Sequence, residues 1–379
     1  MNFTYFAPTK VCFGTIDTEA LQAEIMNYGT NVLLLTGGAS TSAIARKIAD
    51  RLGTEISFQL FSGVATNPLS THIEEIVAKA SKPNVIISVG GGSVHDSAKA
   101  LSIVLTHEGT VEQYTTDGEY SVPGIKNRLI PVITIPTLSG SGAEVSPAAL
   151  IRVRDKKRVI FSPYLYPKTT FIDPSLAMSL SRELFMNSAL DALVQGIESY
   201  VSTASQDFSK RFSKSTITRV IKTLLALRST GITKEIVEQL ALASIEGLYA
   251  VGQSSVGAVH AISDPLSGIF DVHHGHAVGM LLPYVAETNY ESAASAYDDI
   301  QKIFDEATGR RNSSIQKSIL RFYSKIGFDP TTTREKLLAS GFADCFQQCI
   351  RDSYNADMVG NPRELDDALI GKILKKTVG

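Results

Sequence analysis

Residues 84–93 read Asn-Val-Ile-Ile-Ser-Val-Gly-Gly-Gly-Ser. The apolar run predicts a buried strand, and the glycines predict a turn at its end. Helical spacing follows from Val94 to Leu105. Glycines at a strand-to-helix turn let backbone amides approach a pyrophosphate, and the helix N-terminus favours negative charge. The alternative is a tight turn that binds nothing, since a triple glycine alone is a weak signal.

The same alternation extends to both sides of this stretch. Strand-like runs lie at residues 31–36, 56–60 and 128–136, and helical runs lie at 41–52 and 70–79. Alternation of this kind predicts a mostly parallel sheet covered by helices. We therefore expect an α/β dinucleotide-binding domain over residues 1–178, with its ligand at the carboxyl ends of the strands.

Strand-like runs disappear after about residue 180. Amphipathic segments follow at 184–202, 208–227, 234–251, 293–308, 315–326 and 365–375. The pattern predicts an all-helical second domain over residues 179–379. A cleft between two such domains would be the default place for a binding site.

Two further loops favour a nucleotide cofactor. Thr137-Leu138-Ser139-Gly140-Ser141-Gly142 follows the strand predicted at 128–136 and offers hydroxyl and amide donors. Gly37, Gly38 and Ser40 follow the strand predicted at 31–36, and no carboxylate stands there to bind the ribose hydroxyls or repel a 2′-phosphate. We therefore expect NADP(H) to be favoured over NAD(H). The alternative is an ordinary glycine turn.

A helical stretch from Asn187 to Glu198 carries the candidate metal ligands. Asp191 and Gln195 stand four residues apart, so their side chains project about 40° apart and can close on one ion. His260 and His274 follow in a segment punctuated by glycine and proline. Together these residues predict a metal-binding cleft. The alternative is that the polar residues of this helix form its solvated stripe.

Composition excludes several classes of protein. The 379 residues carry a net charge of −2, and the basic residues do not cluster, so nothing indicates binding to nucleic acid or an anionic membrane. No signal peptide or membrane-spanning run is evident. Three cysteines fit a reducing cytosol, and Cys345 and Cys349 are interpreted as ordinary helix residues rather than a zinc site. We expect a soluble cytoplasmic protein.

Seven motifs, in order, resemble those of the iron-containing (group III) alcohol dehydrogenases over nearly the whole chain. They are Phe13-Gly14, 63–68 (Gly-Val-Ala-Thr-Asn-Pro), 90–99 (Gly-Gly-Gly-Ser-Val-His-Asp-Ser-Ala-Lys), 135–145, 189–193 (Ala-Leu-Asp-Ala-Leu), His273-His274-Gly275 with Leu281-Leu282-Pro283, and Asn361-Pro362-Arg363. The resemblance implies an architecture shared with dehydroquinate synthase: a dinucleotide-binding domain, a helical domain and one divalent metal, Fe²⁺ or Zn²⁺. It also implies a homodimer.

Carried over by position, the resemblance implies a set of site residues. The metal ligands would be Asp191, Gln195, His260 and His274, although most members have histidine in place of Gln195. Asp264 stands where many members have a histidine proposed to help proton transfer, so it and His274 become the catalytic candidates, with His273 and His276 flanking. The implied cofactor contacts are Gly37, Gly38, Ser40, Asn67, Gly91, Gly92, Ser93, Asp96, Thr137, Leu138, Ser141 and Lys157.

The resemblance implies a metal-dependent NAD(P)(H) alcohol dehydrogenase that works as an aldehyde reductase. Gln195 and Asp264 suggest a specialised polar substrate, such as a sugar-derived or phosphonate aldehyde. The same two residues keep a metal-free reductase similar to maleylacetate reductase open. Polyol dehydrogenases and dehydroquinate synthase share the architecture, and a non-catalytic scaffold of the same fold is a further alternative.

Overall fold

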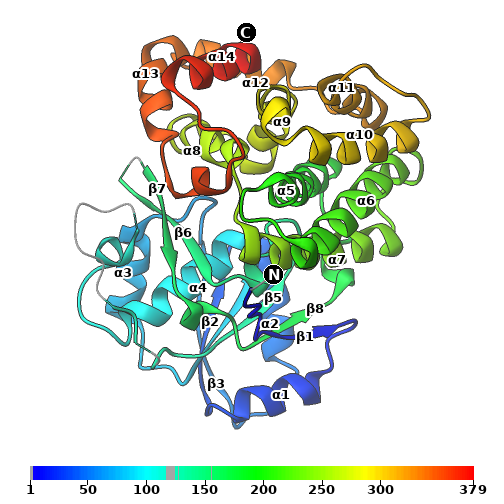
Figure 1. The fold of residues 1–379 in the computed structure, drawn as a ribbon. Helices are drawn as coiled ribbons and strands as arrows, with labels where there is room; N and C mark the ends of the chain where they lie inside the picture. The colour runs from blue at the N-terminus through cyan, green and yellow to red at the C-terminus, as the bar shows by residue number, and fades with distance from the viewer. Residues whose placement is uncertain (1–2, 117–123, 127, 155) are drawn as a thin grey trace. The chain divides into compact units, whose positions relative to one another are not determined.

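A computed structural model describes residues 3–116, 124–126, 128–154 and 156–379. The chain divides into two compact units, Met1–Ser179 and Leu180–Gly379 (Figure 1). The first unit mixes strands and helices, and the second consists of helices and their connections. None of the helices in the described ranges is long and apolar enough to cross a membrane.

The first unit is built on a six-stranded sheet in the order β1-β8-β5-β4-β2-β3, and every neighbouring pair is parallel. The remaining two strands, β6 and β7, form an antiparallel pair of their own. The strands are β1 (Lys10–Phe13), β2 (Asn31–Thr36), β3 (Ser57–Phe61), β4 (Val85–Gly90), β5 (Val132–Pro136), β6 (Ala148–Val153), β7 (Lys156–Phe161) and β8 (Thr169–Ile172). The longer helices are α1 (Thr18–Met26), α2 (Ala39–Ala49), α3 (Ser70–Lys79) and α4 (Gly92–Val104).

The apolar run of β2 is explained by burial on both faces of the sheet. Leu33 and Leu35 enter one core cluster, whereas Val32 and Leu34 enter the other. Alternate residues of a strand point to opposite faces, so a strand that is covered on both sides is apolar throughout. The predicted parallel sheet is confirmed.

Element ends differ from the prediction for local reasons. The helices predicted to begin at Thr41 and Val94 begin two residues earlier, at Ala39 and Gly92, because each starts directly after a glycine N-cap. The strand predicted from residue 128 begins at Val132. Pro131 precedes it and has no N–H for a sheet ladder. The antiparallel β6–β7 pair was not predicted.

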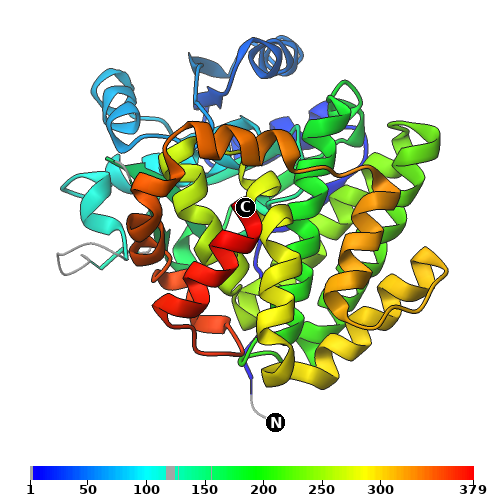
Figure 2. The ribbon, with the colours of Figure 1, turned by 90° about the horizontal axis from the view of Figure 1, so that it is seen from above.

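The second unit contains ten α-helices. They are α5 (Arg182–Val201), α6 (Asp207–Thr230), α7 (Lys234–Ser254), α8 (Ala258–Phe270), α9 (His274–Asn289), α10 (Ala294–Thr308), α11 (Ile315–Ile326), α12 (Thr331–Ala339), α13 (Phe342–Asp352) and α14 (Asp367–Val378). Helix α9 is central: it packs against α5, α8, α11 and α14. Figure 2 shows it in yellow between the green α5 and the red α14.

The sequence did not predict α8 and α9 as helices. Each contains an internal proline, Pro265 in α8 and Pro283 in α9, and most residues of each are buried, polar ones included. Neither helix therefore shows the solvated polar face of a surface helix. Neighbouring helices supply the stability that the local pattern does not indicate.

Candidate functional site

The polar residues of α5 are buried. Asn187, Asp191, Gln195 and Glu198 are 4%, 7%, 5% and 4% exposed. Ionised groups are rarely buried unless they are paired or bind a cation. The solvated-stripe interpretation of this helix is therefore wrong, and these side chains require partners inside the helical unit.

Three candidate ligands from three helices come together here. Nε2 of His260 on α8 lies 3.5 Å from Oδ1 of Asp191, and Nε2 of His274 at the start of α9 lies 3.9 Å from the same oxygen. One ligand atom from each residue lies within 4.8 Å of the others. Ligands bound to one Zn²⁺ at about 2.0–2.2 Å stand only slightly closer together. Two imidazoles and a carboxylate therefore fit a divalent transition metal.

Glu198 fixes the orientation of His260. Its Oε2 lies 2.5 Å from Nδ1 of His260, and its Oε1 accepts the backbone N–H of Val259 at 2.6 Å. With its proton on Nδ1, the ring turns the lone pair of Nε2 toward Asp191. This carboxylate–histidine pair is typical of metal centres. Sequence reasoning missed the role of Glu198, although its spacing from Asp191 places it on the same face of α5.

Ser263 fixes the orientation of His274. Its hydroxyl donates to the carbonyl of His260 at 2.8 Å, so its oxygen is left to accept from Nδ1 of His274 at 3.3 Å. Nε2 of His274 then carries the lone pair that faces Asp191. Both imidazoles thus present the nitrogen that a metal binds.

The electrostatics of the centre favour a positive charge. Burial lowers the pKa of His260, but the carboxylates of Asp191 and Glu198 outweigh burial and raise this pKa to about 10. Either a second proton on His260 or a divalent cation at Nε2 would balance the negative charge of these two carboxylates. The charges at this centre therefore favour the binding of a cation.

A glycine lets α9 approach α5 at the centre. A Cβ atom at Gly275 would lie 2.0 Å from the carbonyl oxygen of Asn187, so a side chain cannot be accommodated without a shift of backbone. Gly275 directly follows His274. The close approach of the two helices therefore sets how far His274 lies from Asp191.

The Asn361-Pro362-Arg363 motif holds one end of each of the two histidine helices. Oδ1 of Asn361 accepts the backbone N–H of Ala258 at 3.2 Å and Nδ2 of Asn289 at 2.7 Å. Ala258 is the first residue of α8, and Asn289 is the last residue of α9. This side chain therefore ties the start of one ligand helix to the end of the other.

Of the remaining candidates, Gln195 contacts one of the three ligands. Nε2 of Gln195 donates to Oδ1 of Asp191 at 3.0 Å. Asp264 is buried one helical turn after His260. His276 lies between Asn187 and Thr333, at 3.3 and 3.0 Å, whereas His273 is exposed. Neither His273 nor His276 belongs to the three-ligand cluster.

In the first unit, the three predicted cofactor loops follow adjacent strands. The loop with Gly37, Gly38 and Ser40 follows β2, the loop with Gly91, Gly92 and Ser93 follows β4, and the loop with Thr137, Leu138 and Ser141 follows β5. The chain runs from β2 to β3 on one side and returns to β4 on the other. The carboxyl ends at such a switch point are where ligands of open parallel sheets bind.

Contacts join the β4 and β5 loops. The backbone N–H of Thr137 donates to the carbonyl of Gly90 at 2.9 Å. A Cβ atom at Gly92 would lie 2.6 Å from Oγ of Ser141, so this glycine permits the two loops to touch. Gly92 also begins α4, whose N-terminus can receive a phosphate.

The β2 and β3 loops are also joined. The backbone N–H of Gly63 donates to the carbonyl of Gly37 at 2.7 Å. Gly38 is the N-cap of α2 and is exposed, as is Ser40. Asn67, in the segment after β3, takes a left-handed conformation with φ of 55°.

Asp96 and Lys157, the two charged cofactor candidates, have different surroundings. Asp96 is buried, and Nζ of the fully buried Lys99 lies 3.4 Å from its Oδ1 and donates to the carbonyl of Ala148 at 2.7 Å. Burial raises the pKa of Asp96, while Lys99 opposes that change. Lys157 lies on β7 and is half-buried. Lys99 therefore joins α4 to β6, and Asp96 pairs with Lys99 on α4.

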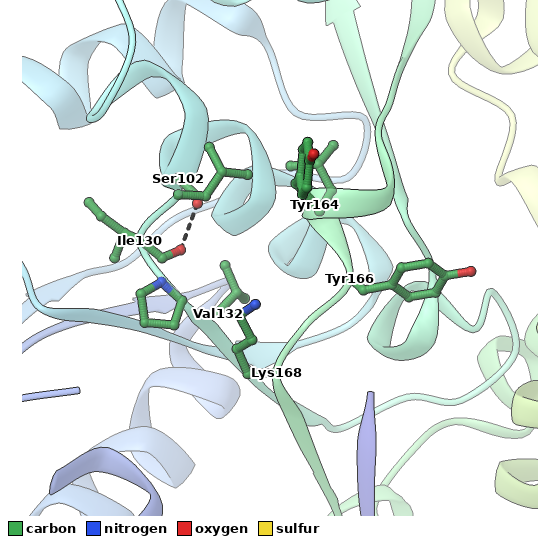
Figure 3. A pocket seen from close by; sticks show the side chains of 9 residues that line it. Ser102, Ile130, Val132, Tyr164, Tyr166 and Lys168 are labelled. Atoms are coloured by element: carbon green, nitrogen blue, oxygen red, sulfur yellow. Dashed lines mark hydrogen bonds between the residues drawn. The ribbon is translucent and has the colours of Figure 1, made fainter. Parts of the chain in front are cut away.

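A cavity of about 20 Å³ in the same unit is not part of this arrangement (Figure 3). Val132 and Lys168 line it, and they stand at or before the amino ends of β5 and β8. The hydroxyl of Ser102 donates to the carbonyl of Ile130 at 2.6 Å across it. The cavity has room for about one water molecule. It lies at the amino ends of these strands, whereas the cofactor loops lie at the carboxyl ends.

The chain matches known proteins over nearly its whole length. A family described as iron-containing alcohol dehydrogenase matches residues 8–174, and the C-terminal part of the Fe-containing alcohol dehydrogenase family matches residues 185–378. The 1,3-propanediol dehydrogenase of Klebsiella pneumoniae is 27% identical over 315 residues, which cover 80% of each protein. The choline dehydrogenase of Bacillus subtilis is 27% identical over 384 residues, which cover 98% of this chain and 94% of that enzyme.

A solved structure is also similar to this chain. The NADH-dependent butanol dehydrogenase A of Thermotoga maritima is 25% identical with a TM-score of 0.85, and the match covers 100% of this chain and 99% of that one. The two family matches each coincide with one compact unit of the structure. The chain therefore belongs to the iron-containing alcohol dehydrogenase family, whose members are oxidoreductases that act on CH–OH groups.

Proposed function

We propose that this protein is a metal-dependent NAD(P)(H) alcohol dehydrogenase that interconverts a primary alcohol and its aldehyde. The observation that carries the proposal is the convergence of His260 Nε2 and His274 Nε2 on Asp191 Oδ1 inside a family of alcohol dehydrogenases. Oxidation of R–CH₂–OH by NAD(P)⁺ gives R–CHO, NAD(P)H and one proton.

The chain's residues would hold the reactants and the proton. Asp191, His260 and His274 would bind the cation, and the loops after β2, β4 and β5 would bind the dinucleotide. When bound, nicotinamide exchanges a hydride with the substrate carbon while the cation polarises the oxygen on that carbon. Asp264, buried on α8 one turn after His260, is the proposed proton acceptor for the alcohol and donor for the reverse reaction.

We propose that NADP(H) is favoured over NAD(H). Gly38 and Ser40 are exposed at the start of α2, and a Cβ atom at Gly38 would meet no other atom within 4 Å. An uncrowded helix N-terminus without a carboxylate accommodates a 2′-phosphate. One similar structure is named as NADH-dependent, so the ratio of kcat/KM for NADPH to that for NADH is the deciding measurement.

For the substrate, we propose a polar alcohol–aldehyde pair, such as a sugar-derived or phosphonate aldehyde. Two relatives are named for a diol and for choline, which are both polar alcohols. Gln195 adds a polar group beside Asp191, and Asp264 adds a buried carboxyl group one turn after His260. A panel of aldehydes that share a chain length but differ in charge would test this.

The experiment that tests the proposed function is elemental analysis of protein purified without chelator, followed by assays of alcohol oxidation and aldehyde reduction. We expect one divalent cation per chain and turnover that is lost in His274→Ala and after chelation. Failure of the cation-loaded protein to turn over any alcohol–aldehyde pair with either nicotinamide would refute the proposal. A protein that also fails to bind a dinucleotide would be a scaffold of this fold.

One observation favours a second candidate, a metal-free reductase similar to maleylacetate reductase. Gln195 directs an N–H, which cannot bind a metal, toward Asp191. Under this alternative, chelator-treated protein would retain full activity.

We also propose that the protein is a homodimer, as the resemblance to the family implies. Sedimentation equilibrium would measure the mass of the assembly.

A further inference from the structure

Gln195 occupies the position beside the three ligands where a fourth protein ligand would stand. It follows Asp191 by one turn of α5, and its side chain is buried. Its Nε2 lies 3.0 Å from Oδ1 of Asp191. The same oxygen faces Nε2 of both histidines. An amide N–H donates and offers no lone pair to a cation.

The other end of the amide faces α7. A Cβ atom at Gly247 would lie 3.2 Å from Oε1 of Gln195, so the missing side chain at this glycine leaves room for the amide oxygen. In the metal-free protein, turning the amide over would place two acceptors, Oε1 of Gln195 and Oδ1 of Asp191, about 3 Å apart, where they would repel each other. The observed orientation instead joins a donor to a carboxylate.

We propose that Gln195 is a positioning residue that donates to Asp191, so that the protein supplies three ligands to the cation: Asp191, His260 and His274. The inference rests on the proposed function for the presence of a divalent cation. The hydrogen bond holds Asp191 in the orientation that its metal-binding oxygen requires. A centre with three protein ligands leaves at least one coordination position open to substrate oxygen.

The direct test is a crystal structure of the protein loaded with Zn²⁺. We expect both polar atoms of the Gln195 amide to lie more than about 3 Å from the ion, while Asp191, His260 and His274 each lie at about 2.0–2.2 Å. These distances can be measured without deciding which amide atom is nitrogen and which is oxygen. An amide atom at bonding distance from Zn²⁺ would overturn the proposal.

A second test measures the Kd for Zn²⁺ by competition with a chromophoric chelator. Loss of a residue that orients a ligand weakens metal binding by about 10–100-fold, and this is expected for Gln195→Leu. His274→Ala should lose stoichiometric Zn²⁺. Val194→Ala is the control, because Val194 is buried next to Gln195 and outside the ligand set, and its Kd should equal that of the wild type.

The outcomes separate the proposal from the proposed function. A Gln195→Leu protein that loses Zn²⁺ as completely as His274→Ala would assign Gln195 as a ligand and overturn the proposal. Wild-type protein that binds no divalent cation would overturn it as well. If the protein holds Zn²⁺ through three residues but turns over no alcohol, the proposed function fails and the assignment of Gln195 stands.

Discussion

The substitution Glu198→Gln is expected to weaken metal binding without unfolding the helical unit. Both oxygens of Glu198 accept hydrogen bonds, one from Nδ1 of His260 at 2.5 Å and one from the backbone N–H of Val259 at 2.6 Å. A glutamine offers one acceptor oxygen and one NH₂ group. Whichever way its amide turns, either the His260 ring or the Val259 N–H meets a donor.

The magnitude follows from these two bonds. A hydrogen bond to a charged acceptor contributes about 1.5–3 kcal/mol to stability. Loss of the partner that orients a histidine ligand weakens metal binding by about 10–100-fold. We therefore expect Glu198→Gln to raise the Kd for Zn²⁺ by one to two orders of magnitude, roughly 1.4–2.7 kcal/mol. Unfolding of the metal-free variant in urea should show a similar loss of stability.

Glu287→Gln is the matched control. Glu287 lies on α9 and forms a surface ion pair with Lys376 at 2.7 Å, with both side chains about 40% exposed. Such pairs contribute about 0–1 kcal/mol, so this variant should keep the Kd of the wild type. If Glu198→Gln bound Zn²⁺ as tightly as Glu287→Gln, then Glu198 would not orient His260 and the reasoning would be refuted.

Because the pKa of His260 is raised to about 10 against about 6.5 when unfolded, this residue should contribute stability to the metal-free protein that is fully present below about pH 6.5 and is lost as pH rises through 10; urea midpoints that do not fall over this range would contradict this. Gly275→Ala would force its new Cβ away from the Asn187 carbonyl, so unfolding and metal titrations should show a loss of about 1–3 kcal/mol and weaker Zn²⁺ binding. Gly38→Asp fits without a steric clash, and it should lower kcat/KM for NADPH at least about tenfold relative to NADH; an unchanged ratio would place the ribose elsewhere. With an open coordination position, alcohols that carry a second oxygen on the adjacent carbon should show a lower KM than simple alcohols, and Gln195→His should narrow that difference.

The α/β unit was largely predictable because its signals are local. An apolar run such as β4, closed by Gly90, Gly91 and Gly92, shows within ten residues that a buried strand turns into a helix. Because the strands are parallel, their carboxyl ends then lie on the same side of the sheet. The antiparallel β6–β7 pair lacks that signal, because its strands carry several charged residues between residues 152 and 158.

The helices that carry the histidines were not predictable in the same way. Their placement depends on contacts between residues far apart in sequence: Gly275 against Asn187, and Asn361 against Ala258 and Asn289. A pattern in one segment holds no information about such contacts. Pro265 also argues locally against the helix that contains it. Only the packing of α8 against α9 and α13 resolves that conflict.

The candidate ligands show where sequence reasoning reaches its limit. Spacing on one helix places Asp191 and Gln195 on the same face, and their side chains do meet at 3.0 Å. Spacing does not say which end of an amide faces the carboxylate, because the two ends have nearly the same shape and opposite hydrogen-bonding character. That choice depends on Asp191 on one side and on the bare backbone of Gly247, on a different helix, on the other. A substitution from imidazole to amide therefore changes more than ligand strength: it adds the possibility of a donor, and with it a different number of protein ligands on the cation.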